Sequence, residues 1–101
     1  DMQFCFVRHN SKHTVTLDAF SLTFHDFDNS NDAHERLLVS DMVSWQTSSE
    51  MDYEPPIPTE LVVEEGENGS VSFMSSTHGY GADNPVDPDN LADQQKARAV
   101  T

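Results

Sequence analysis

Apolar and polar residues alternate along much of this chain, and a period of two residues is typical of β-strands with one buried face. Residues 2–7 and 14–24 follow this pattern on either side of a polar turn at 9–13, which predicts a first hairpin. Further short strands are predicted over residues 37–39, 42–47, 59–64 and 70–77.

The most strongly patterned stretch runs from Leu17 to Val39, and we interpret it as a second hairpin with an acidic tip. A bulge at Asp18-Ala19 would place Phe20, Leu22 and Phe24 together on the core face. Asp26 continues that face, and a carboxylate cannot lie unpaired in a core. We therefore expect Asp26 to be solvated or to hold a cation.

The clearest local prediction is a hairpin over residues 59–77. Val71 and Phe73 alternate with serines, and the turn at 65–69 ends in Asn-Gly, the dipeptide that two-residue hairpin turns prefer. Later in the chain, Asp87-Pro88 combines an N-cap residue with proline at the first helical position. This pair predicts one short helix over residues 88–95, after which residues 98–101 start another strand.

Short strands separated by turns at intervals of about 8–12 residues indicate a mainly β, antiparallel β-sandwich or jelly-roll-like fold. We expect a single domain over residues 1–101, with an acidic, proline-rich linker at 48–58 that cannot occupy a central sheet position. The strand pattern is already running at the first residues and still running at the last. The sandwich is therefore expected to be incomplete, or to be a fragment of a longer one.

Composition narrows the range of partners. Only 36% of the residues are hydrophobic, and eighteen acidic against five basic residues give a net charge of −13. Such a charge argues against nucleic acid and anionic membranes as partners, and favours cations, basic proteins or glycans. The alternative is that the acidic side chains simply keep the surface solvated. Membrane insertion is not expected, since no apolar run approaches ~18 residues. Cys5 is expected to be a buried thiol or to bridge to a segment outside these residues.

The acidic tip offers the best candidate metal site. Asp26, Asp28 and Asp32 supply the carboxylate oxygens that Ca²⁺ prefers, on a loop of polar residues. The spacing is not that of an EF-hand, because Asn31 stands where glycine is needed and Leu37 where the bidentate glutamate is needed. The alternative is a turn in which these side chains bond their own backbone. No other cofactor is predicted.

Two further groups of metal-ligating residues have simpler explanations. A second acidic loop, Asp83-Asn84 with Asp87 and Asp89, could also bind a cation, but helix capping already explains Asp87 and Asp89. Of the five histidines, His9 and His13 share a turn, and His25 and His34 could face each other across the second hairpin. None has a cysteine or second histidine at the spacing of a zinc site.

The sequence does not indicate an enzyme, because it contains neither a nucleophile elbow nor a glycine-rich phosphate loop. Aromatic residues instead suggest contact surfaces. Trp45 lies in a predicted strand, where it is expected to anchor the core. Tyr53 and Tyr80 lie in predicted loops and are the candidate interaction residues, for a protein partner or a sugar ring.

The order of these motifs resembles a group of poorly characterised β-sandwich modules in surface and assembly proteins of marine algae and protists. The resemblance covers residues 20–101 and rests on Phe24–Asp28, Thr59–Leu61, Ser76–Gly79 and Asp83–Pro85. It implies a structural role, and it assigns no activity to any residue. Such modules continue through further strands and a glycine-containing closing motif, which this chain lacks.

Three functional hypotheses follow. The first is a non-enzymatic structural or assembly module that packs with other protein chains, including copies of itself, through exposed strand edges. The second is a calcium-dependent surface adhesion or glycan-binding module. The third is a peripheral subunit fragment of an organellar complex, for example in a plastid. An extracellular or cell-surface location is favoured, with an organelle lumen as the alternative.

Overall fold

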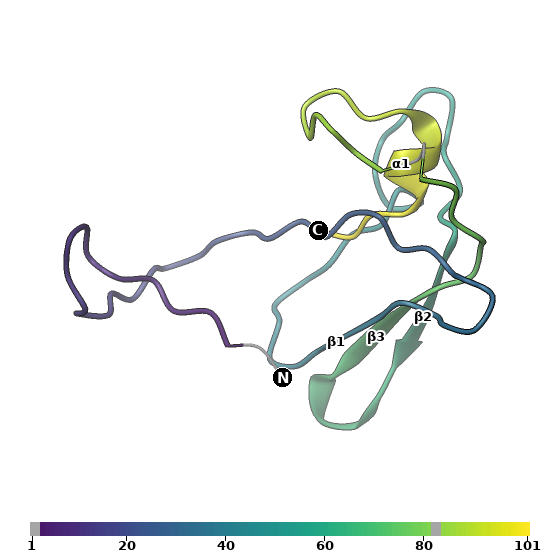
Figure 1. Ribbon diagram of the computed structural model, residues 1–101. Coiled ribbons are helices and arrows are strands. Elements are labelled where there is room, and N and C mark those ends of the chain that lie inside the picture. Colours follow the sequence, from purple (N-terminus) through teal and green to yellow (C-terminus); the bar gives the residue numbers. More distant parts are fainter. Residues whose placement is uncertain (1–2, 82–83) are drawn as a thin grey trace.

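The computed structural model describes residues 3–81 and 84–101, and its regular structure is mainly strand. Strands β1 (Arg36–Val39), β2 (Leu61–Glu65) and β3 (Val71–Ser75) form an antiparallel sheet in the order β1-β3-β2. A 3-10 turn, η1 (Glu67–Gly69), links β2 to β3, and a short helix, α1 (Asp93–Ala97), lies beyond the sheet (Figure 1). The sheet, α1 and the loops around them, residues 23–101, are called the body below.

The β2–β3 hairpin confirms the strongest local prediction. Val63 lies opposite Phe73 in the register, and both side chains face the core. Asn68 and Gly69 have φ angles of 57° and 71°. Asparagine and glycine tolerate this left-handed conformation best, and it lets the chain turn between Gly66, whose amide donates to Ser70 at 2.8 Å, and β3.

The core is small and lies on one face of the sheet. Leu61, Val71 and Phe73 contribute from the strands, while Phe27 and Val100 cover them from the irregular part of the chain. The indole ring of Trp45 packs edge-on against Phe73 with 5.4 Å between ring centres, so the prediction that Trp45 anchors the core is confirmed.

The last residues of the chain run between two segments that lie far from them in the sequence. Val100 forms one bridge to Phe24 and another to Thr47. The backbone of Phe24 both donates to and accepts from Val100, at 2.9 and 3.0 Å, and Gln46 does the same with Thr101. The strand expected over residues 98–101 is therefore present only as these isolated bridges, without a regular strand. The strand expected over residues 42–47 is wrong except at its end, because only Gln46 and Thr47 pair, with Thr101 and Val100.

The expected hairpin over residues 17–39 is also wrong in its pairing. Within the described residues, β1 pairs with β3, and Phe24 pairs with Val100, so the two limbs do not bond to each other beyond the tip. The cause lies at Asp26, whose φ of 67° is left-handed. This turn breaks the alternation, so that Phe27 enters the core in place of Phe20 and Leu22, which are 56% and 42% exposed.

Residues 3–22 form an arm that extends away from the body (Figure 1). Of the hairpin predicted over 2–7 and 14–24, the described residues retain one bridge, between Val7 and Thr14. Cys5 is exposed, which corrects the expectation of a buried thiol. The radius of gyration is 15.3 Å, against about 13 Å for a compact chain of this length. The arm keeps the alternation of apolar and polar residues, but within residues 3–81 and 84–101 its apolar side chains stay exposed.

The helix begins five residues later than predicted. Asp87 accepts a hydrogen bond from the amide of Asp89 at 3.0 Å, forming a local turn in place of an N-cap. The amide of Ala92 is satisfied instead by the side chain of Gln95, at 2.8 Å. Among the described residues, no helix is long and apolar enough to cross a membrane.

Candidate functional site

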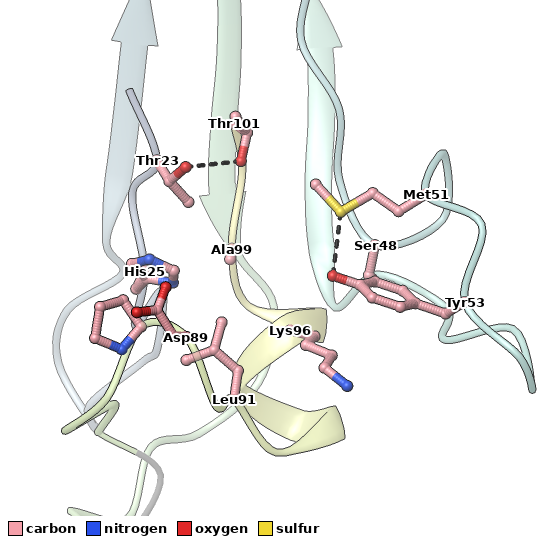
Figure 2. Close-up of a pocket in the computed structure, with 11 residues that line it drawn as sticks. Thr23, His25, Ser48, Met51, Tyr53, Asp89, Leu91, Lys96, Ala99 and Thr101 are labelled. Atoms are coloured by element: carbon pink, nitrogen blue, oxygen red, sulfur yellow. Dashed lines mark hydrogen bonds between the residues drawn. The ribbon is translucent and has the colours of Figure 1, made fainter. Parts of the chain in front are cut away.

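Residues from five segments of the chain line a cleft of about 340 Å³ in the body (Figure 2). One wall carries Thr23 and His25, and another carries the segment from Ser48 to Tyr53. The remaining walls come from the loop at 88–91, the side chain of Lys96, and residues 99–101. The hydroxyls of Thr23 and Thr101 lie 2.9 Å apart and tie the first wall to the last.

Two buried polar atoms belong to residues that line this cleft. The Nδ1 atom of His25 and the Oγ atom of Ser48 are both buried, and neither has a hydrogen-bond partner within the described part of the chain. Ser48 itself is only 2% exposed. A buried polar atom without a partner costs about 1–3 kcal/mol. A water molecule or a ligand that supplies hydrogen bonds here would remove that cost.

The aromatic residue of the cleft is Tyr53. Its hydroxyl donates to the sulfur of Met51 at 3.2 Å, and the ammonium group of Lys96 lies 4.9 Å from its ring centre (Figure 2). The ring is therefore held in place on two sides. Tyr53 was predicted as an interaction residue from its loop position, and the structure places it at the cleft.

A turn at residues 47–50 positions Ser48. The amide and the hydroxyl of Thr47 both donate to one carboxylate oxygen of Glu50, at 2.7 and 2.6 Å. The hydroxyl bond is the largest cause of the pKa of Glu50 lying below its ordinary value. Burial acts in the opposite direction, and the amide bond lowers the pKa further. Because Thr47 is fully buried, this turn is a fixed part of the body rather than a mobile link.

The predicted calcium ligands have different surroundings. Asp26 faces the side-chain amide of Asn84. With that amide oriented so that its nitrogen points toward Asp26, the nitrogen donates to the carboxylate at 2.9 Å. The carboxylate of Asp28 lies over Gly79, where an added Cβ would overlap it. Asp32 is exposed in the turn at the tip. No group of three or more metal-ligating side chains occurs among residues 3–81 and 84–101, so calcium binding stays a prediction that calorimetric titration can test.

The other predicted residues lie away from the cleft or outside the described structure. Tyr80 is 72% exposed, and its ring packs edge-on against His78 with 5.4 Å between ring centres. Asp83, which begins the second acidic loop, lies outside the described residues. The linker at 48–58 contains no strand or helix, yet it supplies Ser48, Met51 and Tyr53 to the cleft.

The cleft lining includes a serine, a histidine and an aspartate, namely Ser48, His25 and Asp89. Nucleophilic catalysis needs a serine hydroxyl within hydrogen-bond reach of its base. Ser48 Oγ has no hydrogen-bond partner among the described residues. What the cleft offers is a set of hydroxyl, imidazole, carboxylate and ammonium groups beside one aromatic ring, which is suited to binding a small polar molecule.

Sequence reasoning did not single out Ser48, and it considered His25 only as a partner of His34. A serine at the start of a polar linker carries no signal of burial. His25 lies next to Phe24 in an apolar stretch, and this position is a signal that its side chain is partly buried. The residues that share the cleft with it come from 48–53 and 88–101. Only the three-dimensional fold brings these segments together.

Comparison with protein-family models, with curated proteins and with solved structures finds no match to this chain. The resemblance to algal and protist surface modules therefore stays a prediction from the motifs alone.

Proposed function

We propose that this chain is a non-enzymatic structural or assembly module, which packs with other protein chains in a larger complex or a surface layer. The observation that carries the proposal is the apolar surface of the arm. Seven of its apolar side chains are between 37% and 62% exposed: Phe4, Phe6, Val7, Val15, Leu17, Phe20 and Leu22. The three phenylalanines alone expose on the order of 300 Å², since a whole aromatic side chain offers about 200 Å². An exposed apolar area of a few hundred Å² is often part of an interaction surface.

The sheet supports the same proposal. Within the described residues β1 and β2 are edge strands, each bonded on one side only, to β3. The outward face also carries Leu38 and Val62, which are 62% and 40% exposed. An unpaired edge beside apolar residues is a template for a strand from another chain. A complete sandwich would arise when such a strand, or a layer built from it, joins this sheet.

The proposal predicts that the isolated chain is only marginally stable. Its core holds few side chains, and the arm contributes almost nothing to it. We therefore expect a broad, low-temperature thermal transition at low micromolar concentration, followed by both circular dichroism and Trp45 fluorescence. A sharp cooperative transition of a chain shown to be monomeric by light scattering would contradict the proposal, because it would mean that the module is complete by itself.

A second candidate function, glycan binding, is favoured by the two unpartnered polar atoms in the cleft. Sugar hydroxyls can both donate and accept, so a ring that contacts Tyr53 could bond to His25 Nδ1 and Ser48 Oγ once these buried side chains turn toward the cleft. The cleft volume of about 340 Å³ falls in the range of small-molecule sites.

A nuclear magnetic resonance titration with a panel of monosaccharides tests this second candidate. We expect amide shifts clustered at residues 23–25, 48–53 and 96–101, and about a tenfold loss of affinity in Ser48→Ala. Ser76→Ala, at an exposed serine outside the cleft, is the matched control. Shifts scattered over the surface, or equal affinities of the two variants, would contradict glycan binding at this site.

A further inference from the structure

The arm and the body carry charges of opposite sign. Within residues 3–22 the charged side chains are Arg8, Lys12 and Asp18, which gives a net charge of +1, and His9 and His13 lie in the same turn. The body holds sixteen of the eighteen acidic residues and three of the five basic ones, for a net charge of −13. The chain is thus an apolar arm with a basic tip attached to a strongly acidic body.

The arm already has the form of a docking element. The amide of Arg8 donates to His13 at 2.9 Å, and the amide of Val15 donates to Phe6 at 2.9 Å, so the basic turn is closed by two backbone bonds. Beyond it, the rings of Phe6 and Phe20 meet edge-on with 4.7 Å between ring centres. These rings are nevertheless 39% and 56% exposed. The turn and the ring pair order the arm locally and leave its apolar side uncovered.

The body offers a groove that matches this element. It has a volume of about 500 Å³ and lies between residues 24–27 and β1. Phe24, Phe27 and Leu37 give it apolar walls, and Glu35 adds a carboxylate. The side chain of Arg36, which also lines the groove, is engaged with the hydroxyl of Ser72 at 2.7 Å. Since β1 bonds only to β3 within the described residues, its other edge is available on the same side.

We propose that the arm of one copy of this chain occupies the groove of a second copy, and that the exchange is reciprocal. The inference rests on the proposed assembly function and names its partner. Phe6 and Phe20 would enter the groove beside Phe24 and Leu37, the arm would add to the free edge of β1, and Arg8 and Lys12 would meet acidic surface. Direct contact between two bodies would instead oppose two charges of −13, so an arm is the part of this chain suited to joining copies.

Sedimentation equilibrium on the full chain is the first test. The natural chain should form a dimer, and both Phe6→Ser/Phe20→Ser and Arg8→Glu/Lys12→Glu should weaken it by about tenfold or more. Val86→Ser is the matched control, because Val86 is 98% exposed and belongs to neither arm nor groove. A dimer that survives in both arm variants would overturn the inference.

Cross-linking between copies is the second test, and it identifies the occupant of the groove. The natural chain, whose single cysteine is Cys5 on the arm, is mixed with a Cys5→Ser/Glu35→Cys chain and treated with a short bismaleimide. We expect a cross-linked heterodimer, and little product with Cys5→Ser/Val86→Cys. In a chain carrying both Cys5 and Glu35→Cys, a cross-link within one diluted monomer would show that the arm folds onto its own body, and would overturn the exchange.

The two proposals can fail separately. A broad thermal transition of a chain that remains monomeric at every concentration would overturn arm exchange and leave an assembly role with a different partner. A sharp transition of the monomer would overturn the assembly role itself, whatever the cross-linking result.

Discussion

Replacing Phe73 by alanine should cost about 3–5 kcal/mol of folding free energy, as is usual for truncating a fully buried phenylalanine. Phe73 is 1% exposed, lies on the central strand β3 and packs against Trp45. The cavity would open in the middle of the core, among Leu61, Val71 and Phe27. Because small domains have little stability in reserve, we expect the variant to lose the protection of its sheet amides against hydrogen exchange and to shift Trp45 emission to longer wavelength.

Leu38→Ala is the matched control for Phe73→Ala. Leu38 lies on the neighbouring strand β1, but its side chain is 62% exposed and points away from the core. We expect its free-energy cost to remain below about 1 kcal/mol. If the two variants lost equal amide protection, the core would not be centred on Phe73 as described.

Replacing Glu60 by glutamine should be the second most damaging change, at about 3 kcal/mol. Arg98 is 2% exposed, and its Nε donates to the Glu60 carboxylate at 2.7 Å, while the Thr77 hydroxyl donates to the same oxygen at 2.7 Å. The variant keeps the size of the side chain but removes the negative charge that the buried Arg98 guanidinium contacts. We place the cost at the low end of the range for buried pairs because the Glu60 side chain is 33% exposed.

Glu64→Gln on β2 provides the comparison, since Glu64 is exposed and on the same segment of chain. Its effect should stay within about 0.5 kcal/mol. The free energies can be compared through the exchange rates of the same β2 and β3 amides in both variants. Similar rates for Glu60→Gln and Glu64→Gln would mean that the buried ion pair does not hold the C-terminal segment to the sheet.

The part of the fold that sequence reasoning predicted is the part determined locally. The β2–β3 hairpin needs only alternation and an Asn-Gly turn, both of which lie within a few residues of each other. The pairing of β1 could not be predicted this way, because alternation shows that one face is apolar but not which strand will pair. For the same reason Phe20 and Leu22 were expected in the core, although only their spacing supported it.

Single-residue geometry accounts for other errors. The left-handed conformation at Asp26 changes which aromatic residue enters the core, and an aspartate in a strand-like run gives little warning of it. At Asp87 the local Asx turn competed successfully with a helix N-cap, and the same residue type favours both. The cleft could not be predicted at all, because its lining residues come from segments as far apart as Thr23 and Thr101.

The position of the C-terminal segment also has a consequence for the order of folding. Thr23 and Thr101 are separated by 78 residues, and the bridges of Val100 to Phe24 and Thr47 span 76 (100 − 24) and 53 (100 − 47) residues. Contacts of high sequence separation cost more loop-closure entropy and slow the rate of folding, whereas the β2–β3 hairpin can nucleate early. Phe24 and Phe27 would then stay uncovered until residues 98–101 arrive. During that interval a second chain competes with the first for the same apolar surface, so the concentration at which this protein folds would help to decide which assembly it reaches.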